Sequence, residues 1–437
     1  MKSAPVTFRE ALLFWLKLGF ISFGGPAGQI AIMHTELVER RRWISERRFL
    51  HALNYCMVLP GPEAQQLATY IGWLMHKTWG GVMAGVLFVL PSLALLIALS
   101  WVYMAWGHVP VVAGIFLGIK PAVAAIVLHA AYRVGTRALK HAALWVLAAA
   151  SFMAVYVWGL PFPLIVAAAA AIGLAGGRWA PWVFQSSAAH ASSGALPQDA
   201  WIGDHTPTPP HAQHSSKRLA AVLAVGLALW ATPLAVMTVV EGWNHTLPQM
   251  GWFFTKAALL TFGGAYAVLP YVLQGAVEHH AWLTASQMMD GLALGETTPG
   301  PLIMVVAFVG FVGGYAKALF GPDQLFMAGA VAAMWVTWFT FLPSFLFILA
   351  GGPLVESTHN QWKLTAPLTA ITAAVVGVIL SLAVFFGVHV MWPQGFSGHV
   401  DAISALMALG AAVALFRFKA NVIAVIGVCA VLGLLRL

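Results

Sequence analysis

The sequence predicts an all-α integral membrane protein made of two inverted repeats with broken and re-entrant helices. Three observations predict it: the composition, glycine and proline motifs that occur twice in one register, and a reversal of charge between the copies. Of the 437 residues, 60% are hydrophobic and 8% are charged, against roughly 25% charged in soluble domains. So few charges cannot keep a protein of this size dissolved, which excludes a water-soluble enzyme.

The duplicated motifs divide the chain into two halves. Phe23-Gly24-Gly25 matches Phe262-Gly263-Gly264 at a shift of 239 residues, and the same shift pairs Pro60-Gly61-Pro62 with Pro299-Gly300-Pro301. Two motifs in a single register are not expected by chance. The predicted organisation is an N-terminal repeat over 8–176, a cytoplasmic linker over 177–217, a connecting transmembrane helix over 218–246 and a C-terminal inverted repeat over 247–437.

The stretches between the two motifs carry opposite charge in the two halves. The first contains five arginines between positions 40 and 48, whereas no Lys or Arg occurs from Ala257 to Ala316, where Glu278, Asp290 and Glu296 lie. By the positive-inside rule the first stretch is cytoplasmic and the second is on the other side. The halves are therefore predicted to be inverted, an architecture common in secondary transporters, with a cytoplasmic N-terminus and a periplasmic C-terminus.

The first apolar segment, residues 10–33, is too short on either side of its glycines to cross the bilayer. Only 14 residues of this segment precede Gly24-Gly25-Pro26, against the ~20 that a spanning helix needs. Both ends of the segment are also predicted to be cytoplasmic, so we expect a re-entrant pair of half-helices here and at the other three motifs. Conventional full spans at each motif are the alternative. Nine full spans then remain, near residues 79–105, 111–132, 142–158, 160–177, 218–240, 324–350, 365–389, 401–417 and 420–436.

Other sites are weakly indicated. Ala188–Ser216 is rich in Ser, Pro and His and is predicted to be a solvated linker, although its histidines offer a metal site as an alternative. Cys56 and Cys429 are too few for a disulfide framework or a thiolate metal cluster. No catalytic or nucleotide-binding motif occurs, so no enzyme activity, metal or cofactor is expected. The four linker histidines are His190, His205, His211 and His214.

The four motifs are the predicted substrate site. A half-helix that begins at Pro26 or Pro62 places unpaired N–H groups and the positive end of the helix dipole near the bilayer midplane, which favours an anion. Four such ends at ~+0.5 each present about +2, which suits a divalent oxyanion. The alternative is that Gly and Pro only break helices or allow close packing. The predicted substrate-binding motifs are Phe23-Gly24-Gly25-Pro26, Pro60-Gly61-Pro62, Phe262-Gly263-Gly264 and Pro299-Gly300-Pro301.

Four ionisable residues accompany these motifs. Lys17 and Lys256 each lie seven residues before the first glycine of a glycine pair, and a lysine at mid-membrane costs ~2.5–3.5 kcal/mol. We interpret them as cations beside the anion site, with snorkelling to an interface as the alternative. Glu63 and Glu296 are candidates for proton coupling, because a dry cavity favours a protonated carboxyl group. A favourable partner for the helix dipole is the simpler reading of both.

These motifs resemble those of a known family. Phe23-Gly24-Gly25-Pro26, Trp43-Ile44-Ser45 and the stretch from Leu59 to Ala64 are similar to the first-half signature of the chromate ion transporter (CHR) family. Thr261-Phe262-Gly263-Gly264 and Thr298-Pro299-Gly300-Pro301 are similar to its second-half signature in the long two-domain form. One departure is Ala265, which stands where Pro26 stands in the first half.

The resemblance implies a bacterial inner-membrane secondary transporter that exports chromate with the proton gradient and confers chromate resistance. It implies about thirteen membrane segments in antiparallel halves, to which nine spans and four hairpins correspond. The expected partners are chromate, protons and the lipid bilayer, without nucleic acid. A sulfate or broader oxyanion carrier, an uncoupled anion channel and a homodimeric assembly stay open as alternatives.

Overall fold

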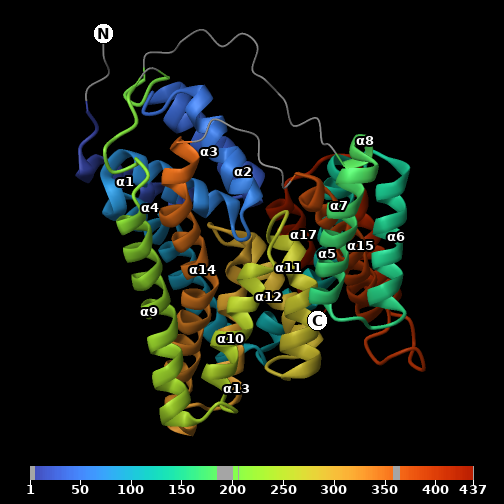
Figure 1. The fold of residues 1–437 in the computed structure, drawn as a ribbon. Coiled ribbons are helices and arrows are strands. Elements are labelled where there is room, and N and C mark those ends of the chain that lie inside the picture. Colours follow the sequence, from blue (N-terminus) through green and yellow to red (C-terminus); the bar gives the residue numbers. More distant parts are fainter. Residues whose placement is uncertain (1–4, 185–199, 205, 358–364, 437) are drawn as a thin grey trace.

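The computed structural model describes residues 5–184, 200–204, 206–357 and 365–436 (Figure 1). Apart from one isolated bridge between Ile44 and Ile202, the regular structure of these residues is helical, which confirms an all-α protein. The first-half elements are α1 (Phe8–Ile21), α2 (Gly25–His34), η1 (Thr35–Arg40), α3 (Glu46–Val58), α4 (Glu63–Trp106), α5 (Pro110–Ala138), α6 (Ala142–Tyr156), α7 (Phe162–Trp179) and α8 (Pro181–Phe184).

The second half begins after a separate connecting helix, α9 (Ser216–Glu241). Its elements follow the order of the first half, with broken pairs first and longer helices after them. They are α10 (Thr246–Leu259), α11 (Ala265–Val272), η2 (Leu273–His279), α12 (Ala285–Thr297), η3 (Leu302–Met304), α13 (Val305–Ala316), η4 (Pro322–Gln324), α14 (Leu325–Ser357), α15 (Thr365–Met391), α16 (Ala402–Phe416) and α17 (Val422–Leu434).

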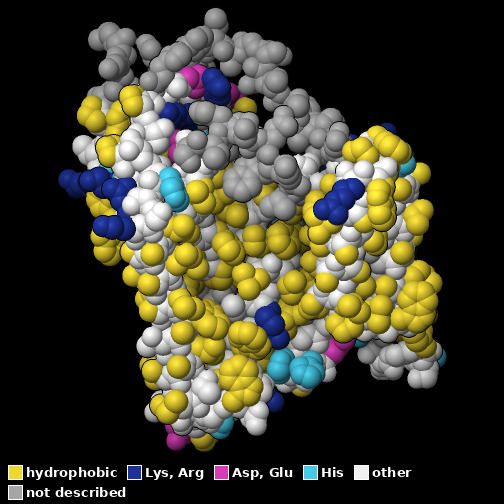
Figure 2. All heavy atoms as spheres, in the orientation of Figure 1, with side chains coloured by type: hydrophobic (Ala, Val, Ile, Leu, Met, Phe, Trp, Pro, Cys, Tyr) yellow, Lys and Arg dark blue, Asp and Glu magenta, His cyan; other side chains and the backbone are white. Residues whose placement is uncertain are grey.

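Six helices of the described chain are long and apolar enough to cross a membrane: α4, α5, α7, α9, α14 and α15. Each of the nine predicted spans falls on a helix, but α6, α16 and α17 have only 15, 15 and 13 residues, fewer than the ~20 that a perpendicular span needs. Hydrophobic side chains cover most of the visible face (Figure 2). Val239 and Val240 of α9 are among the exposed ones, as expected for a helix in contact with lipid.

The helices form two groups (Figure 1). The first group contains α1 to α4, α9, α10, α13 and α14, and the second contains α5 to α8 and α15 to α17; α11 and α12 lie between them. Small residues bring the helices of the second group close together. Gly118 of α5 packs against the backbone of α17 at Cys429 and Gly433, and Gly377 of α15 packs against Ala148 of α6, the close approach that drives association in membranes.

All four motifs interrupt helices. The breaks lie between α1 and α2, α3 and α4, α10 and α11, and α12 and η3. Helix α4 is itself two arms, since His76 and Lys77 have non-helical backbone angles. The arms fold back on each other, because a Cβ at Gly72 would lie 2.5 Å from the Gly80 carbonyl oxygen. The predicted span 79–105 is therefore the second arm, and residues 63–75 form the half-helix that follows Pro62.

The broken pairs also fold back. The side chain of Arg41, just after η1, lies 3.8 Å from that of Glu10 near the start of α1. The Phe14 and Trp43 rings are 5.1 Å apart, and the rings of Phe253 and Trp282, their equivalents after a shift of 239, are 5.5 Å apart. The start and the end of each pair therefore lie side by side, which is the shape that re-entrant insertion requires.

The described part of the linker packs in places against the first half, although Pro207, Pro210, Gln213 and His214 are exposed. Ser45 donates a hydrogen bond to Asp204 at 2.6 Å, and the Trp201 N–H donates to the Arg42 carbonyl at 3.0 Å. The His211 ring lies 2.9 Å from the Trp73 carbonyl oxygen, whereas His190 and His205 lie outside the described residues. Within the described ranges no three His, Cys, Asp or Glu side chains gather as metal ligands.

Candidate anion-binding cavity

A cavity of about 1230 Å³ separates the two groups of helices beside the helix breaks. Its walls come from α2, α3, the C-terminal end of α5, the N-terminal end of α11 and the first turns of α15. The rim carries His34, Glu39 and Lys140, close to the arginine-rich connector. Deeper in the cavity lie Pro26, Glu63, Arg133, Gly264 and Tyr266.

The second Phe-Gly-Gly motif lines the cavity, whereas Phe23, Gly24 and Gly25 of the first motif are not among the lining residues. Phe262, Gly263 and Gly264 line the cavity, as does Pro26 of the first half. A Cβ at Gly24 or Gly264 would meet no described atom within 4 Å. The amide ends of α2 and α11 are therefore accessible from the cavity, which is the geometry that anion binding at a helix N-terminus needs.

Arg133 adds a full positive charge that the sequence did not reveal. The predicted span stopped at residue 132, but α5 continues to Ala138 and carries Arg133 into the cavity wall. A Cβ built at Gly25 would lie 3.9 Å from the Arg133 Nη2 atom. The repeat could not have marked this residue, because the corresponding helix, α15, contains no Lys or Arg.

One acidic side chain interacts with this charge, and another lines the same cavity. Glu296 accepts a hydrogen bond from the hydroxyl group of Tyr266, in the first turn of α11, and Arg133 acts electrostatically on both. Glu63 lines the cavity at the first position of α4. The structure thus places Glu296 within electrostatic reach of Arg133 and places Glu63 in the lining of the cavity.

The Pro-Gly-Pro motifs lie in a different environment. Gly61 and Gly300 are buried with φ of +122° and +112°, in a region that favours glycine. The Gly61 N–H donates to the Thr261 carbonyl oxygen at 2.8 Å, and the Gly300 N–H donates to that of Ser22 at 2.7 Å. A shift of 239 converts one bond into the other. These amides bind the opposite half of the chain, and Gln29 also donates to the Gly300 carbonyl oxygen at 2.6 Å.

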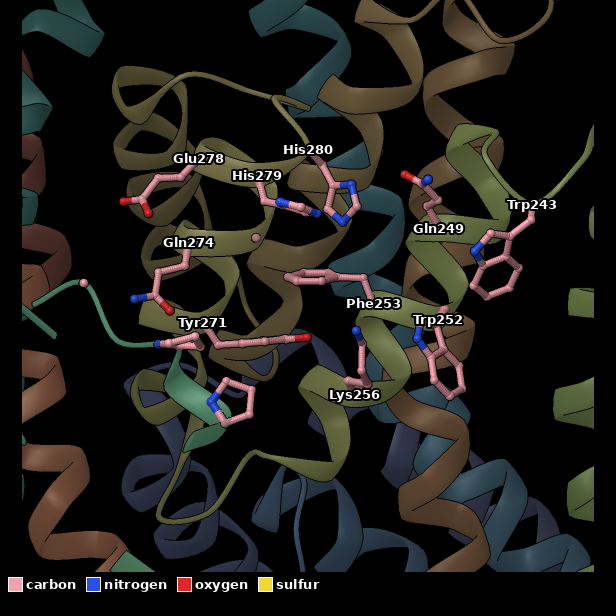
Figure 3. Close-up of a pocket in the computed structure, with 14 residues that line it drawn as sticks. Trp243, Gln249, Trp252, Phe253, Lys256, Tyr271, Gln274, Glu278, His279 and His280 are labelled. Carbon is pink, nitrogen blue, oxygen red and sulfur yellow. The ribbon is translucent and has the colours of Figure 1, made fainter. Parts of the chain in front are cut away.

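The two predicted lysines are not brought together. Lys17 is exposed on α1 and lines neither of the two cavities described for this chain. Lys256 lines a second cavity of about 590 Å³, together with Gln274 and His280 (Figure 3). Its Nζ atom lies 5.7 Å from the centre of the Trp252 ring, a cation–π contact.

The described helices form two apolar groups with discontinuous helices between them, and the cavity at the breaks is lined in part by charged side chains. These are features of a polytopic membrane transport protein. The sequence model of the family described as chromate transporter matches residues 9–174 and 248–434. The chain belongs to this family.

Relatives cover most of the chain. It is 37% identical to a chromate transport protein of Pseudomonas aeruginosa over 86% of this chain and 80% of that protein. It is 28% identical to a chromate transport protein of Cupriavidus metallidurans, over 95% and 90% of the two chains. An uncharacterized transporter of Methanocaldococcus jannaschii is 24% identical, over 97% and 93%. No solved structure matches the chain significantly.

Proposed function

We propose that the protein is a secondary active transporter that exports chromate across the bacterial inner membrane, coupled to protons, and so confers chromate resistance. The observation that carries the proposal is the cavity in which Arg133 lies beside the open amide ends of α2 and α11. The names of the relatives in Pseudomonas aeruginosa and Cupriavidus metallidurans support chromate as the substrate.

The charge of this site suits a dianion. Two helix N-termini contribute ~+0.5 each, and with the guanidinium of Arg133 they present about +2. Arg offers parallel N–H donors that match two oxygens of a tetrahedral oxyanion. The motifs at Pro60-Gly61-Pro62 and Pro299-Gly300-Pro301 contribute by fixing the breaks, since their glycine amides bind protein carbonyl groups.

We further propose that the halves are inverted repeats over 8–176 and 247–437, with a cytoplasmic N-terminus and a periplasmic C-terminus. The equivalent hydrogen bonds of Gly61 and Gly300 support this relation. Figure 1 also shows α2 and α3 toward one end of the molecule and α10 and α13 toward the other. The arginine-rich connector then places the large cavity on the cytoplasmic side, where chromate to be exported is bound.

Proton coupling is assigned to Glu63 and Glu296. An ionised Glu296 competes with the substrate for the charge of Arg133, so protonation of Glu296 strengthens anion binding. A dianion that leaves with one proton still moves one negative charge outward, which a potential of 100 mV (inside negative) favours by ~2.3 kcal/mol. Export by this route is driven by the potential and opposed by an inward proton gradient.

The mutual strengthening of proton binding and anion binding also favours a second candidate function. Because proton and dianion strengthen each other's binding, the site also suits a proton–oxyanion symporter that imports sulfate. Uptake of labelled chromate into proteoliposomes, under pH gradients and potentials of either sign and with or without sulfate, separates the candidates. Chromate movement driven by potential and altered by pH supports the export proposal. Preferential transport of sulfate supports import, and a conductance indifferent to pH supports an uncoupled channel.

A further inference from the structure

A second buried charge centre lies away from the large cavity. Asp290 of α12 is only 2% exposed. The Tyr103 hydroxyl group of α4 donates to its Oδ2 atom at 2.9 Å, and the Lys120 Nζ atom of α5 lies 3.7 Å from that oxygen. The Oδ1 atom is buried and has no hydrogen-bond partner among the described residues. Ionisable groups inside a membrane bundle are costly and generally functional.

This cluster joins the two groups of helices. Tyr103 belongs to the first group, Lys120 belongs to the second, and Asp290 lies on α12 between them. Within α5, Lys120 precedes Arg133 by thirteen residues, which is about 20 Å along the axis at ~1.5 Å per residue. The Lys120–Asp290 pair therefore connects the groups near the middle of α5, on the side away from the cavity rim.

A polar bridge accompanies the pair at this end. The side chain of Gln274, in η2, accepts from the Phe162 N–H at 3.1 Å and donates to the Leu160 carbonyl oxygen at 3.3 Å. Leu160 and Phe162 follow α6, whose opposite end at Leu144 lines the large cavity. This bridge thus joins the segment between the groups to the second group, at the end where the groups do not enclose the large cavity.

The ion pair has no equivalent in the other half. Lys120 precedes Pro121, whereas the matching Pro367 is preceded by Ala366, and the shift of 239 replaces Asp290 by His51. Two identical repeats would stabilise the conformation closed on one side as much as the conformation closed on the other side. A contact present on one side only biases the equilibrium toward the conformation that contains it.

We propose that Lys120 and Asp290 are positioning residues of the transport cycle, which hold the remote side closed and break apart when the cavity opens there. The inference rests on the proposed function, because it assumes that the cavity is exposed to the two sides in turn. Tyr103 keeps the carboxylate oriented toward Lys120 in the closed arrangement.

The test measures accessibility rather than transport. Single cysteines replace Thr372, which lines the large cavity, and Gln249, which lines the second one. Their reaction with a membrane-impermeant maleimide is followed in vesicles of either orientation. For Asp290→Asn we expect labelling to fall about tenfold at position 372 and to rise at position 249, the size of a typical conformational coupling. Lys120→Met gives the same test where Asp290→Asn does not fold.

The matched control is Asp401→Asn, because Asp401 and Arg436 form a 2.8 Å ion pair within the second group of helices. It should leave both labelling rates unchanged, and the exchange Lys120→Asp with Asp290→Lys should restore the original pattern. Unchanged labelling in folded Asp290→Asn and Lys120→Met overturns the inference. Absence of chromate transport by the unsubstituted protein would instead overturn the proposed function, and the labelling rates would still report which side of the protein is open.

Discussion

Arg133→Gln is the substitution that tests the proposed site most directly. The guanidinium lies in the cavity wall, 3.9 Å from a Cβ built at Gly25. Hydrogen bonds to charged groups are worth about 1.5–3 kcal/mol, and each ~1.4 kcal/mol corresponds to a tenfold change in affinity. We therefore expect chromate to bind the variant about 10- to 150-fold more weakly, while the protein still inserts and folds.

Arg137→Gln provides the control. Arg137 lies one turn further along α5 and also lines the cavity, but its side chain is exposed. Interactions of exposed charges are worth about 0–1 kcal/mol, so the loss should be at most about fivefold. Arg133→Lys retains the charge without the paired donors and should fall between the two.

The assay is equilibrium binding of labelled chromate to the purified protein in detergent, with the KM for uptake into proteoliposomes as a second measurement. Thermal unfolding confirms that the variants are folded. Binding by Arg133→Gln within twofold of the unsubstituted protein would refute the placement of the site. Equal losses in Arg133→Gln and Arg137→Gln would show that only the net charge of the cavity matters.

Three further predictions concern other parts of the structure. Gly300→Ala should lower the free energy of unfolding by about 3 kcal/mol, through its positive φ and a Cβ 2.6 Å from that of Ser92; unfolding in denaturant measures this. Lys256→Ala should weaken chromate uptake about threefold through loss of a cation in the second cavity, whereas the exposed Lys17→Ala should not; equal effects in transport assays would contradict this. Partial burial alone would raise the pKa of Asp401, but hydrogen bonds from Ser404 and the charge of Arg436 lower it below its usual 3.8. Its contribution to stability is therefore present above pH 3.8 and lost below it, so the lower melting temperature of Asp401→Asn should converge with that of the unsubstituted protein as the pH falls through this range.

The helix breaks could be predicted from the sequence because glycine and proline act locally. Proline lacks the N–H that a helix interior needs, and Gly61 and Gly300 adopt a positive φ. The repeat then predicted that equivalent breaks would occur in both halves. Composition alone was sufficient for the all-α membrane class, since a long apolar chain must satisfy its backbone internally.

Whether a helix break faces a cavity or binds the other half of the chain could not be predicted, because this depends on contacts between distant segments. The sequence gives no sign that the Gly61 N–H binds Thr261 while Gly264 faces a cavity. Lys17 and Lys256 have equivalent positions in the repeat, yet only Lys256 lines one of the two described cavities. Arg133 escaped prediction because a charged residue at the end of an apolar run is ordinarily placed in a loop.

Repeated and unrepeated residues have different roles in this architecture. The motifs preserved by the shift of 239 build the breaks and the exchanged hydrogen bonds, which any two-state transporter made of two halves needs on both sides. The charged residues assigned to the site lack such counterparts: Glu63 corresponds to Leu302, Glu296 corresponds to Met57, and Arg133 corresponds to no cation in α15. Two equivalent halves cannot by themselves favour substrate binding from one side of the membrane over the other. The preference for one side must therefore arise from the unrepeated charges, where substitutions should change coupling and direction without removing the fold.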